Sequence, residues 1–388
     1  MIMYFDFATY FRMIRLAFQE QNPTGRRRLF YQLFVVVPFV ATFHAVCFFL
    51  DYMLFPGLRT VEVRTPVFMV GHARSGTTLL HRLMNKDGER FSAFLFYELF
   101  FPSLLQKKVI RFLARCDRRF LGGWFERKVK AWEDRKYAAT RQMHYISLTA
   151  PEEDDFIYTY SCASGFWITM LPYMGLLDFY YVDQYPPDKR RRHMNFYKEC
   201  VKRQLYLNGT EKIHLSKNPT FSGRVESLIE TFPDARIVVL MRNPNETIPS
   251  LLKMMKINWS LWSDTEMARS LQVLADQSFH TYKYPLEVLA RHPEVKHAVV
   301  DYRALVAQPK RTVEEIYAQL GFAVTPEFGQ VLVEEEKKAG RHETTHTYSL
   351  EEFGLKSDAI RTQLAELFER YGWDSEDASQ TTTAKGGS

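Results

Sequence analysis

The sequence has little of what marks several protein classes. Only four of its 388 residues are cysteine, and none of them forms a CxxC pair, which argues against a disulfide scaffold and against a cysteine zinc site. Whether Cys116, Cys162 and Cys200 pair is left open by the sequence. The excess of basic residues is only +6, too small to indicate nucleic-acid binding. An anionic small ligand or an anionic membrane surface suits this charge better.

Charge is missing altogether from residues 29–50, near the N-terminus. A helix of that length covers roughly 33 Å, enough to cross a bilayer. Three arginines at 26–28 precede it, and residues 1–20 are aromatic-rich, as in an interfacial helix. We therefore predict that residues 1–57 form a membrane-associated helical segment, either a single span or an in-plane helix. The alternative is a helix pair packed on the main domain.

The compartment depends on the source of the chain. A single span with cytoplasmic arginines would place the domain that follows it across the membrane, in the Golgi lumen of a eukaryote. In a bacterium, we expect attachment to the cytoplasmic face of the inner membrane.

From residue 66 onward, short β-rich runs alternate with helical patterns. Runs such as PVFMVG, ARIVVLM and HAVVDY are each followed by an amphipathic stretch. This alternation predicts an α/β fold with a mainly parallel, P-loop-like sheet flanked by helices. We expect the catalytic domain to cover residues 58–374, with a mostly helical, aromatic insertion at about 99–211. The polar tail, 375–388, is predicted to be disordered.

A glycine-rich turn, GHARSGTT at 71–78, joins a predicted strand to a helix. Backbone amides and the helix dipole meet an anion at such a turn. Its spacing matches the nucleotide-binding GxxxxGK[ST] loop, but Thr77 stands at the lysine position and the cation is Arg74. A magnesium NTPase would also need an aspartate after a buried strand, where this chain has Arg242. The pattern therefore indicates phosphate binding without a carboxylate-bound metal.

These motifs resemble those of sulfotransferases that use 3′-phosphoadenosine 5′-phosphosulfate (PAPS). VGHARSGTTLLHRLM is similar to their 5′-phosphosulfate loop, and RNPNETIPSLL to their 3′-phosphate motif. The resemblance runs from about residue 66 to residue 373. It implies that PAPS donates a sulfuryl group and leaves as 3′,5′-ADP, with no metal required. The residues expected to bind it are Arg74, Ser75, Gly76, Thr77, Thr78, Arg242 and Ser250.

The resemblance also implies three catalytic residues. Arg74 and Lys217 would stabilise charge on the transferred and leaving groups. Glu98, placed after the second core strand, would act as general base, and its apolar neighbours should raise its pKa. His81 and His144 are alternative bases, and Tyr302 is a weaker candidate on the adenine or phosphate side.

Two further patterns suggest metal sites. HETTH at 342–346 fits a zinc-protease motif, but we expect it in a loop, where that motif does not work. EEDD at 152–155 could bind a divalent ion and is more typical of an acidic helix start.

The resemblance implies that the acceptor group is a hydroxyl or amine, and the strongly aromatic insertion leads us to expect a lipid-like or other apolar small molecule. The alternatives are a carbohydrate acceptor, or an inactive nucleotide-binding scaffold of the same fold. A homo-oligomer is possible, and no nucleic-acid partner is expected.

Overall fold

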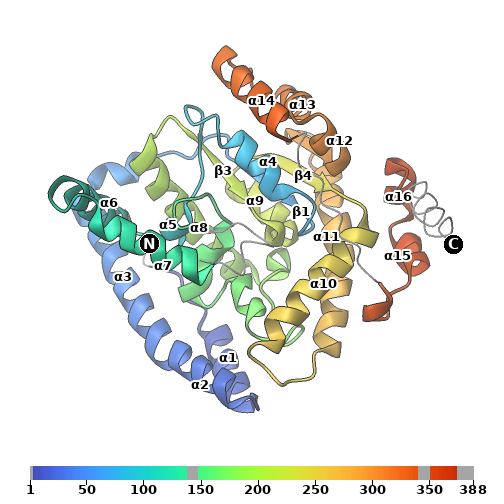
Figure 1. The fold of residues 1–388 in the computed structure, drawn as a ribbon, viewed down its shortest axis with the longest axis horizontal. Coiled ribbons are helices and arrows are strands. Elements are labelled where there is room, and N and C mark those ends of the chain that lie inside the picture. Colours follow the sequence, from blue (N-terminus) through green and yellow to red (C-terminus); the bar gives the residue numbers. More distant parts are fainter. Residues whose placement is uncertain (1–2, 138–146, 340–349, 374–388) are drawn as a thin grey trace.

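Five short strands form one sheet at the centre of the structure, a computed structural model that describes residues 3–137, 147–339 and 350–373 (Figure 1). The strands are β1 (Val67–Gly71), β2 (Phe91–Ser92), β3 (Ile213–Lys217), β4 (Arg236–Met241) and β5 (His297–Asp301). Their order is β2-β3-β1-β4-β5, and each runs parallel to its neighbours. The predicted parallel α/β sheet is confirmed.

Alternate side chains of the strands point to opposite faces of the sheet and enter two hydrophobic cores. On one face, Val70 and Val239 join the larger core with α8 to α11. On the other, Met69 and Leu240 pack against α4, α13 and α14. The helices that cover the sheet are α4 (Thr77–Met84), α8 (Pro187–Asn208), α9 (Val225–Thr231), α10 (Pro244–Ser260), α11 (Ala268–Arg291), α12 (Tyr302–Ala307), α13 (Pro309–Leu320) and α14 (Pro326–Ala339). Because helices bury both faces, the strands read as continuous apolar runs.

The region between β2 and β3 is mostly helical and rich in buried aromatic rings. It contains α5 (Phe96–Phe100), α6 (Leu104–Phe120), α7 (Trp124–Lys136), three short 3-10 helices at Asp154–Ser161, Gly165–Thr169 and Val182–Gln184, and α8. Towards the C-terminus, a 3-10 turn (Glu351–Phe353) leads into α15 (Ser357–Gln363) and α16 (Ala365–Tyr371). The predicted disordered tail, HETTH and His144 lie outside the described residues.

The N-terminal segment folds as two helical stretches along one side of the molecule (Figure 1). These are α1 (Phe7–Gln19) and a continuous helix of 32 residues composed of α2 (Pro23–Tyr31), a π-helical turn (Gln32–Val36) and α3 (Val37–Leu54). A short 3-10 turn (Pro56–Thr60) then leads to β1. The long helix has the length and composition of a membrane span, which is weak evidence for one.

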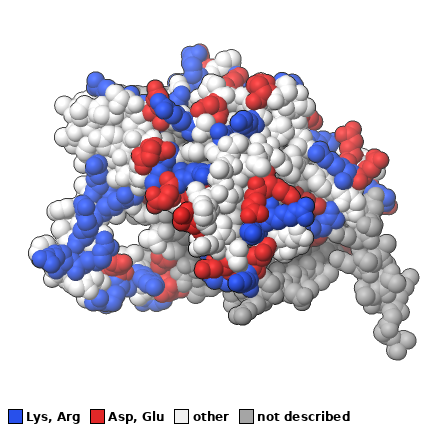
Figure 2. All heavy atoms as spheres, turned by 90° about the horizontal axis from the view of Figure 1, so that it is seen from above, with Lys and Arg blue, Asp and Glu red and all other residues white. Residues whose placement is uncertain are grey.

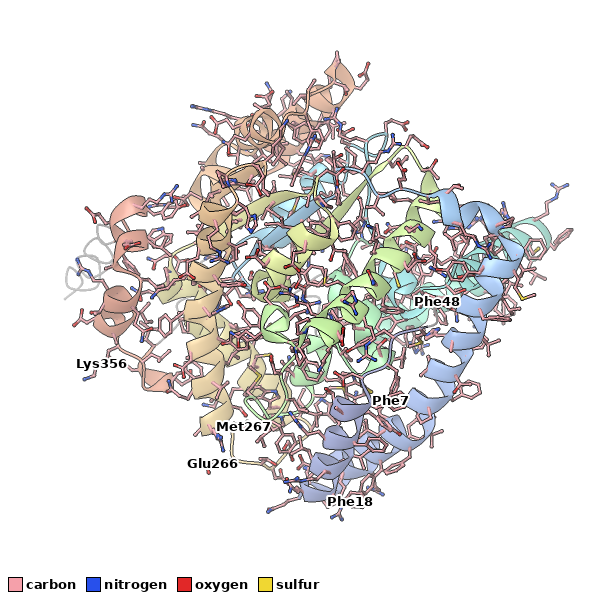
Figure 3. All side chains as sticks on the ribbon, turned by 180° about the vertical axis from the view of Figure 1, so that it is seen from behind. Phe7, Phe18, Phe48, Glu266, Met267 and Lys356 are labelled. Carbon is pink, nitrogen blue, oxygen red and sulfur yellow. The ribbon has the colours of Figure 1, made fainter. Side chains whose placement is uncertain are left out.

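One face of α3 is packed against the protein, and the other carries exposed apolar side chains. Phe48 points inward and is 1% exposed, whereas Phe7 and Phe18 of α1 lie on the outside (Figure 3). Asp51 is fully buried and forms an ion pair with Arg203 of α8 at 2.8 Å. The predicted boundary near residue 57 therefore falls between segments that share a core and a buried ion pair.

Candidate active site

Four loops leave the same edge of the sheet, because the carboxyl ends of parallel strands lie together. The phosphate loop follows β1, and Lys217 ends β3. Arg242 follows β4, and Tyr302 follows β5. The predicted phosphate-binding residues therefore gather at one edge although they are far apart in the sequence.

The phosphate loop has the backbone that close approach to an anion requires. Gly71 and Gly76 have φ values of +127° and +90°. A side chain at Gly71 would come within 2.5 Å of the Leu240 carbonyl oxygen. Arg74 also adopts a positive φ, 72°, which is strained for a residue with a side chain and is typical of functional loops. Ser75 and Thr77 are buried, and Thr78 is half-buried.

The phosphate loop and the predicted 3′-phosphate motif meet through two contacts. The Arg74 Nε donates a hydrogen bond to the Ser250 hydroxyl at 3.2 Å. Arg242 donates from Nη1 to the Arg74 carbonyl oxygen at 3.1 Å and forms an ion pair with Glu246. Three donors from separate motifs thus surround one edge of the loop, as a nucleotide with two phosphate sites would require.

Two tyrosines hold this arrangement in place. The Tyr302 ring lies against Gly76, where an added Cβ would be 2.5 Å from Cδ2, and the Arg242 guanidinium stacks on it at 4.3 Å. The Tyr282 hydroxyl donates to the Arg242 carbonyl oxygen at 2.7 Å. Tyr282 was missed in the sequence because it lies in α11, outside any motif.

Lys217 is a buried cation between two carboxylates. Its Nζ lies 3.1 Å from Glu152 and 3.0 Å from Glu153, and its side chain is 1% exposed. Burial alone would lower the pKa of Lys217, but Glu153 and Glu152 outweigh it and raise that pKa above its usual value. Lys217 is therefore charged at neutral pH. No pattern in the sequence predicts that the acidic run at 152–155 contacts the LSKNP turn.

The other two acids of that run also have partners. Asp154 pairs with His214 and accepts a hydrogen bond from the Tyr197 hydroxyl. Asp155 forms an ion pair with Arg224 at 3.2 Å. Within residues 3–137, 147–339 and 350–373, no group of three His, Cys, Asp or Glu side chains could hold a metal ion.

Glu98 makes contacts that stabilise the start of α5. One carboxylate oxygen accepts a hydrogen bond from the Leu95 amide at 3.1 Å, closing the first turn. The other forms an ion pair with Arg111 at 3.0 Å, and Arg111 also donates to Asn208. The Glu98 side chain is fully buried. Its surroundings are thus partly ionic, not only apolar as the sequence suggested.

His81, one alternative base, lies on α4, on the face of the sheet that α4 covers. The ring is buried on α4 near the Leu215 carbonyl oxygen, and burial lowers the pKa of His81 to about 4. It is therefore neutral at physiological pH and has no exposed face toward an acceptor.

A parallel α/β sheet with a phosphate loop and two arginines beside it suits the binding of an anionic ligand. The sequence profile of the sulfotransferase family matches residues 66–326, which is most of the chain. The chain belongs to the sulfotransferase family, and it is a sulfotransferase.

Two characterised relatives extend this comparison. The omega-hydroxy-beta-dihydromenaquinone-9 sulfotransferases of Mycobacterium bovis and Mycobacterium tuberculosis are each 26% identical to this chain over 331 residues. Each alignment covers 81% of this chain and 77% of the relative.

Solved structures share the fold. The sulfotransferase STF9 of Mycobacterium avium matches with a TM-score of 0.73 at 19% identity, over 95% of this chain and 93% of the other. The sulfotransferase STF1 of Mycobacterium tuberculosis H37Rv matches with a TM-score of 0.64 at 18% identity, over 93% of each chain.

Proposed function

We propose that this enzyme transfers a sulfuryl group from PAPS to the hydroxyl of a lipid-like acceptor. The main observation that supports PAPS as the donor is the contact between the phosphate loop and the 3′-phosphate motif, where the Arg74 Nε lies 3.2 Å from the Ser250 hydroxyl. Two separate anion sites on one edge suit a nucleotide with phosphates at both its 5′ and its 3′ positions. The acceptor class is supported by the two relatives, whose names specify a hydroxylated menaquinone.

In this proposal, PAPS supplies the sulfuryl group and 3′,5′-ADP leaves. The acceptor oxygen forms a bond to sulfur, the bond from sulfur to the 5′-phosphate oxygen breaks, and the acceptor proton passes to a carboxylate. Arg74 and the first amides of α4 stabilise the charge on the sulfuryl oxygens. Lys217 is held in its charged form, and because its side chain is 1% exposed it must shift away from Glu152 or Glu153 to stabilise the leaving phosphate oxygen. Arg242 and Ser250 hold the 3′-phosphate, and Arg242 exchanges Glu246 for it.

Two carboxylates are candidates for the base. Glu98 is the residue that the family resemblance indicates, but it is fully buried and paired with Arg111. Glu153 is paired with Lys217, and its side chain is 31% exposed, so it is more accessible to an acceptor than Glu98. We therefore place the base at Glu153 and assign Glu98 to positioning α5 and its neighbours, with direct proton transfer by Glu98 as the competing assignment.

Single-turnover transfer of ³⁵S from labelled PAPS to geranylgeraniol, in the presence of EDTA, tests the function and separates the two candidates. Glu153→Gln should slow the transfer on the order of 10²-fold at unchanged thermal stability. Glu98→Gln should lower stability, because it removes the charge that faces Arg111, and slow the transfer much less. The opposite pattern would return the base to Glu98. Absence of transfer to geranylgeraniol by the wild-type chain, with 3′,5′-ADP still bound, would contradict the lipid-like acceptor and leave the carbohydrate acceptor and the inactive scaffold.

We also propose that the enzyme lies on the membrane, with the α1–α3 segment in its plane, because α3 is apolar outside yet tied to the domain through Asp51. The cytoplasmic face of a bacterial inner membrane fits a cytoplasmic nucleotide donor and the mycobacterial relatives. The Golgi alternative would need a true span.

A further inference from the structure

A large cavity lies between α3, α6 and α7, and its lining includes no residue of the phosphate loop at 71–78. Its volume is about 1920 Å³, roughly twice the upper end of the usual range for small-molecule sites. Most of the side chains around it are apolar, including Phe43, Val46, Leu113, Phe125 and Val129. A cavity of this size and lining suits a long hydrocarbon chain.

One wall of the cavity is continuous with the residues that contact Lys217. Leu95 and Thr149 line it, and Leu95 pairs with Pro151 in an isolated bridge. The next residue, Glu152, donates its amide to the Phe94 carbonyl oxygen and places its carboxylate 3.1 Å from Lys217. Thr149 precedes Glu152 by only three residues, and this short span begins in a turn where the Ala150 amide donates to the Ser147 carbonyl oxygen at 3.1 Å. The cavity and the Lys217 carboxylates thus share a short, hydrogen-bonded wall.

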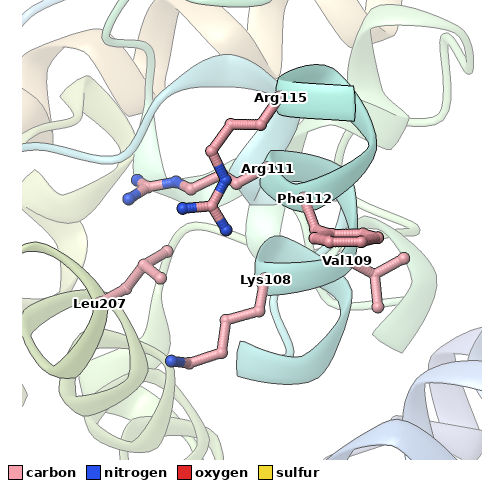
Figure 4. Close-up of a pocket in the computed structure, with 6 residues that line it drawn as sticks. All are labelled: Lys108, Val109, Arg111, Phe112, Arg115 and Leu207. Atoms are coloured by element: carbon pink, nitrogen blue, oxygen red, sulfur yellow. The ribbon is translucent and has the colours of Figure 1, made fainter. Parts of the chain in front are cut away.

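Basic side chains on α6 border the same cavity. Lys108, Arg111 and Arg115 face a groove of about 480 Å³ that ends at Leu207 of α8 (Figure 4). Arg111 and Arg115 line both the groove and the cavity. Figure 2 shows Lys and Arg gathered at the end of the molecule where α6 lies in Figure 1. Such a cationic border matches the phosphate layer of an anionic membrane.

The apolar side chains beside these cations are exposed. Phe120 is 77% exposed and Phe125 55%, while Phe39 on the outer face of α3 is 72% exposed. Aromatic side chains among lysine and arginine are typical of helices that lie at the membrane interface. The cavity therefore opens on a surface suited to a bilayer.

We propose that this cavity takes the hydrocarbon chain of a membrane alcohol, a polyprenyl-type lipid with a terminal hydroxyl, and presents that hydroxyl to Glu153 and Lys217. This assignment rests on the proposed sulfuryl transfer and adds the place and class of the acceptor. A second protein copy is a poorer occupant, because a cavity this deep needs a chain that enters it. The reaction consumes one hydroxyl and PAPS, and yields the lipid sulfate, 3′,5′-ADP and a proton.

The reactivity of the Cys116 thiol can be used to measure whether the cavity is occupied. It lines the cavity and is half-buried, whereas the other three cysteines are buried. Burial raises the pKa of the Cys200 thiol to about 12 and also raises the pKa of Cys47 and of Cys162, so these thiols react slowly with maleimides. Alkylation of the full-length chain by N-ethylmaleimide should therefore follow Cys116, and Cys116→Ser should remove the fast phase.

The experiment measures this alkylation with geranylgeraniol delivered on cyclodextrin, against the five-carbon alcohol prenol. We expect geranylgeraniol to slow the alkylation at least fivefold and prenol to leave it unchanged. Ala114→Trp fills the cavity from α6 and should abolish the protection. Ala131→Trp, at an exposed position on α7 outside the cavity lining, is the matched control and should retain it.

The same variants separate the cavity from the function. Ala114→Trp should lower kcat/KM for geranylgeraniol at least tenfold, with sulfation of prenol and binding of 3′,5′-ADP within twofold of wild type. Equal alkylation with and without geranylgeraniol in the wild-type chain would overturn the cavity assignment, even if prenol is sulfated. Protection without sulfation of either alcohol would overturn the proposed function and leave a lipid-binding cavity.

Discussion

Asp51 connects the N-terminal helix to the catalytic domain, so its substitution should lower the free energy of unfolding by more than the loss of a single surface contact would. Its carboxylate accepts hydrogen bonds from the Ser103 hydroxyl at 2.9 Å and from the Leu104 and Leu105 amides at 2.9 and 2.7 Å. It thereby caps α6 from another helix. It also pairs with Arg203, whose side chain is fully buried.

Asp51→Ala leaves the buried Arg203 with only Glu199 as an anionic partner, 3.0 Å away. Breaking a buried ion pair costs about 3–5 kcal/mol, and loss of a helix cap adds about 1 kcal/mol, so we expect a loss of about 3–5 kcal/mol in total because the two effects overlap. Urea unfolding of the full-length chain in mild detergent measures it. Glu62→Ala, which removes a pair with Arg64 whose side chains are 68% and 80% exposed, should cost less than about 1 kcal/mol. A loss below about 1 kcal/mol for Asp51→Ala would refute the packing described for α3.

Three further outcomes are expected. Deleting residues 1–56 should give no soluble folded domain by circular dichroism, because the deletion removes Asp51, and a soluble product that binds 3′,5′-ADP would instead support an independent domain from residue 57. Gly76→Ala should weaken 3′,5′-ADP binding at least tenfold by calorimetry, because the new Cβ would lie 2.5 Å from the Tyr302 ring. A double variant with Tyr302→Ala should recover part of the affinity. Full affinity in the single variant would contradict the loop geometry. The free energy of unfolding should be highest above pH 6.5 and fall towards pH 4, because burial lowers the pKa of His44, His72 and His81 from 6.5 to about 4. Between these pH values the unfolded chain binds more protons than the folded chain, so the slope should approach about 4 kcal/mol per pH unit. A flat profile from urea unfolding would contradict the burial of these three rings.

The parallel sheet and the phosphate loop could be predicted because their signals are local. A buried strand, a glycine turn and a helix follow one another within residues 66–84, and the strand that ends before Arg242 repeats the pattern. Glycine at 71 and at 76 reflects backbone angles that other residues rarely adopt. These features depend on residues that are close together in the chain, so a short stretch of sequence is enough to predict them.

The partners of buried charges could not be predicted in the same way. Lys217 meets Glu152 and Glu153 across more than sixty residues of insertion, and Asp51 meets Arg203 across 152. Glu98 has apolar neighbours in the sequence, yet Arg111 reaches it from one turn of α6. These contacts depend on how helices of the insertion pack, which no short pattern specifies. They decide which carboxylate is available for catalysis and whether the N-terminal segment is separate.

The proposed function requires that one edge of the sheet bind a nucleotide carrying both a 5′- and a 3′-phosphate, without a metal. Calorimetric titration of the full-length chain with 3′,5′-ADP and with AMP, both in EDTA, tests it most directly. A charge-assisted bidentate contact contributes about 2–3 kcal/mol, so AMP should bind about 30- to 160-fold more weakly. Arg242→Ala should remove most of that difference while leaving AMP binding unchanged. Equal affinity for the two nucleotides in the wild-type chain, or binding that appears only with Mg²⁺, would contradict the account.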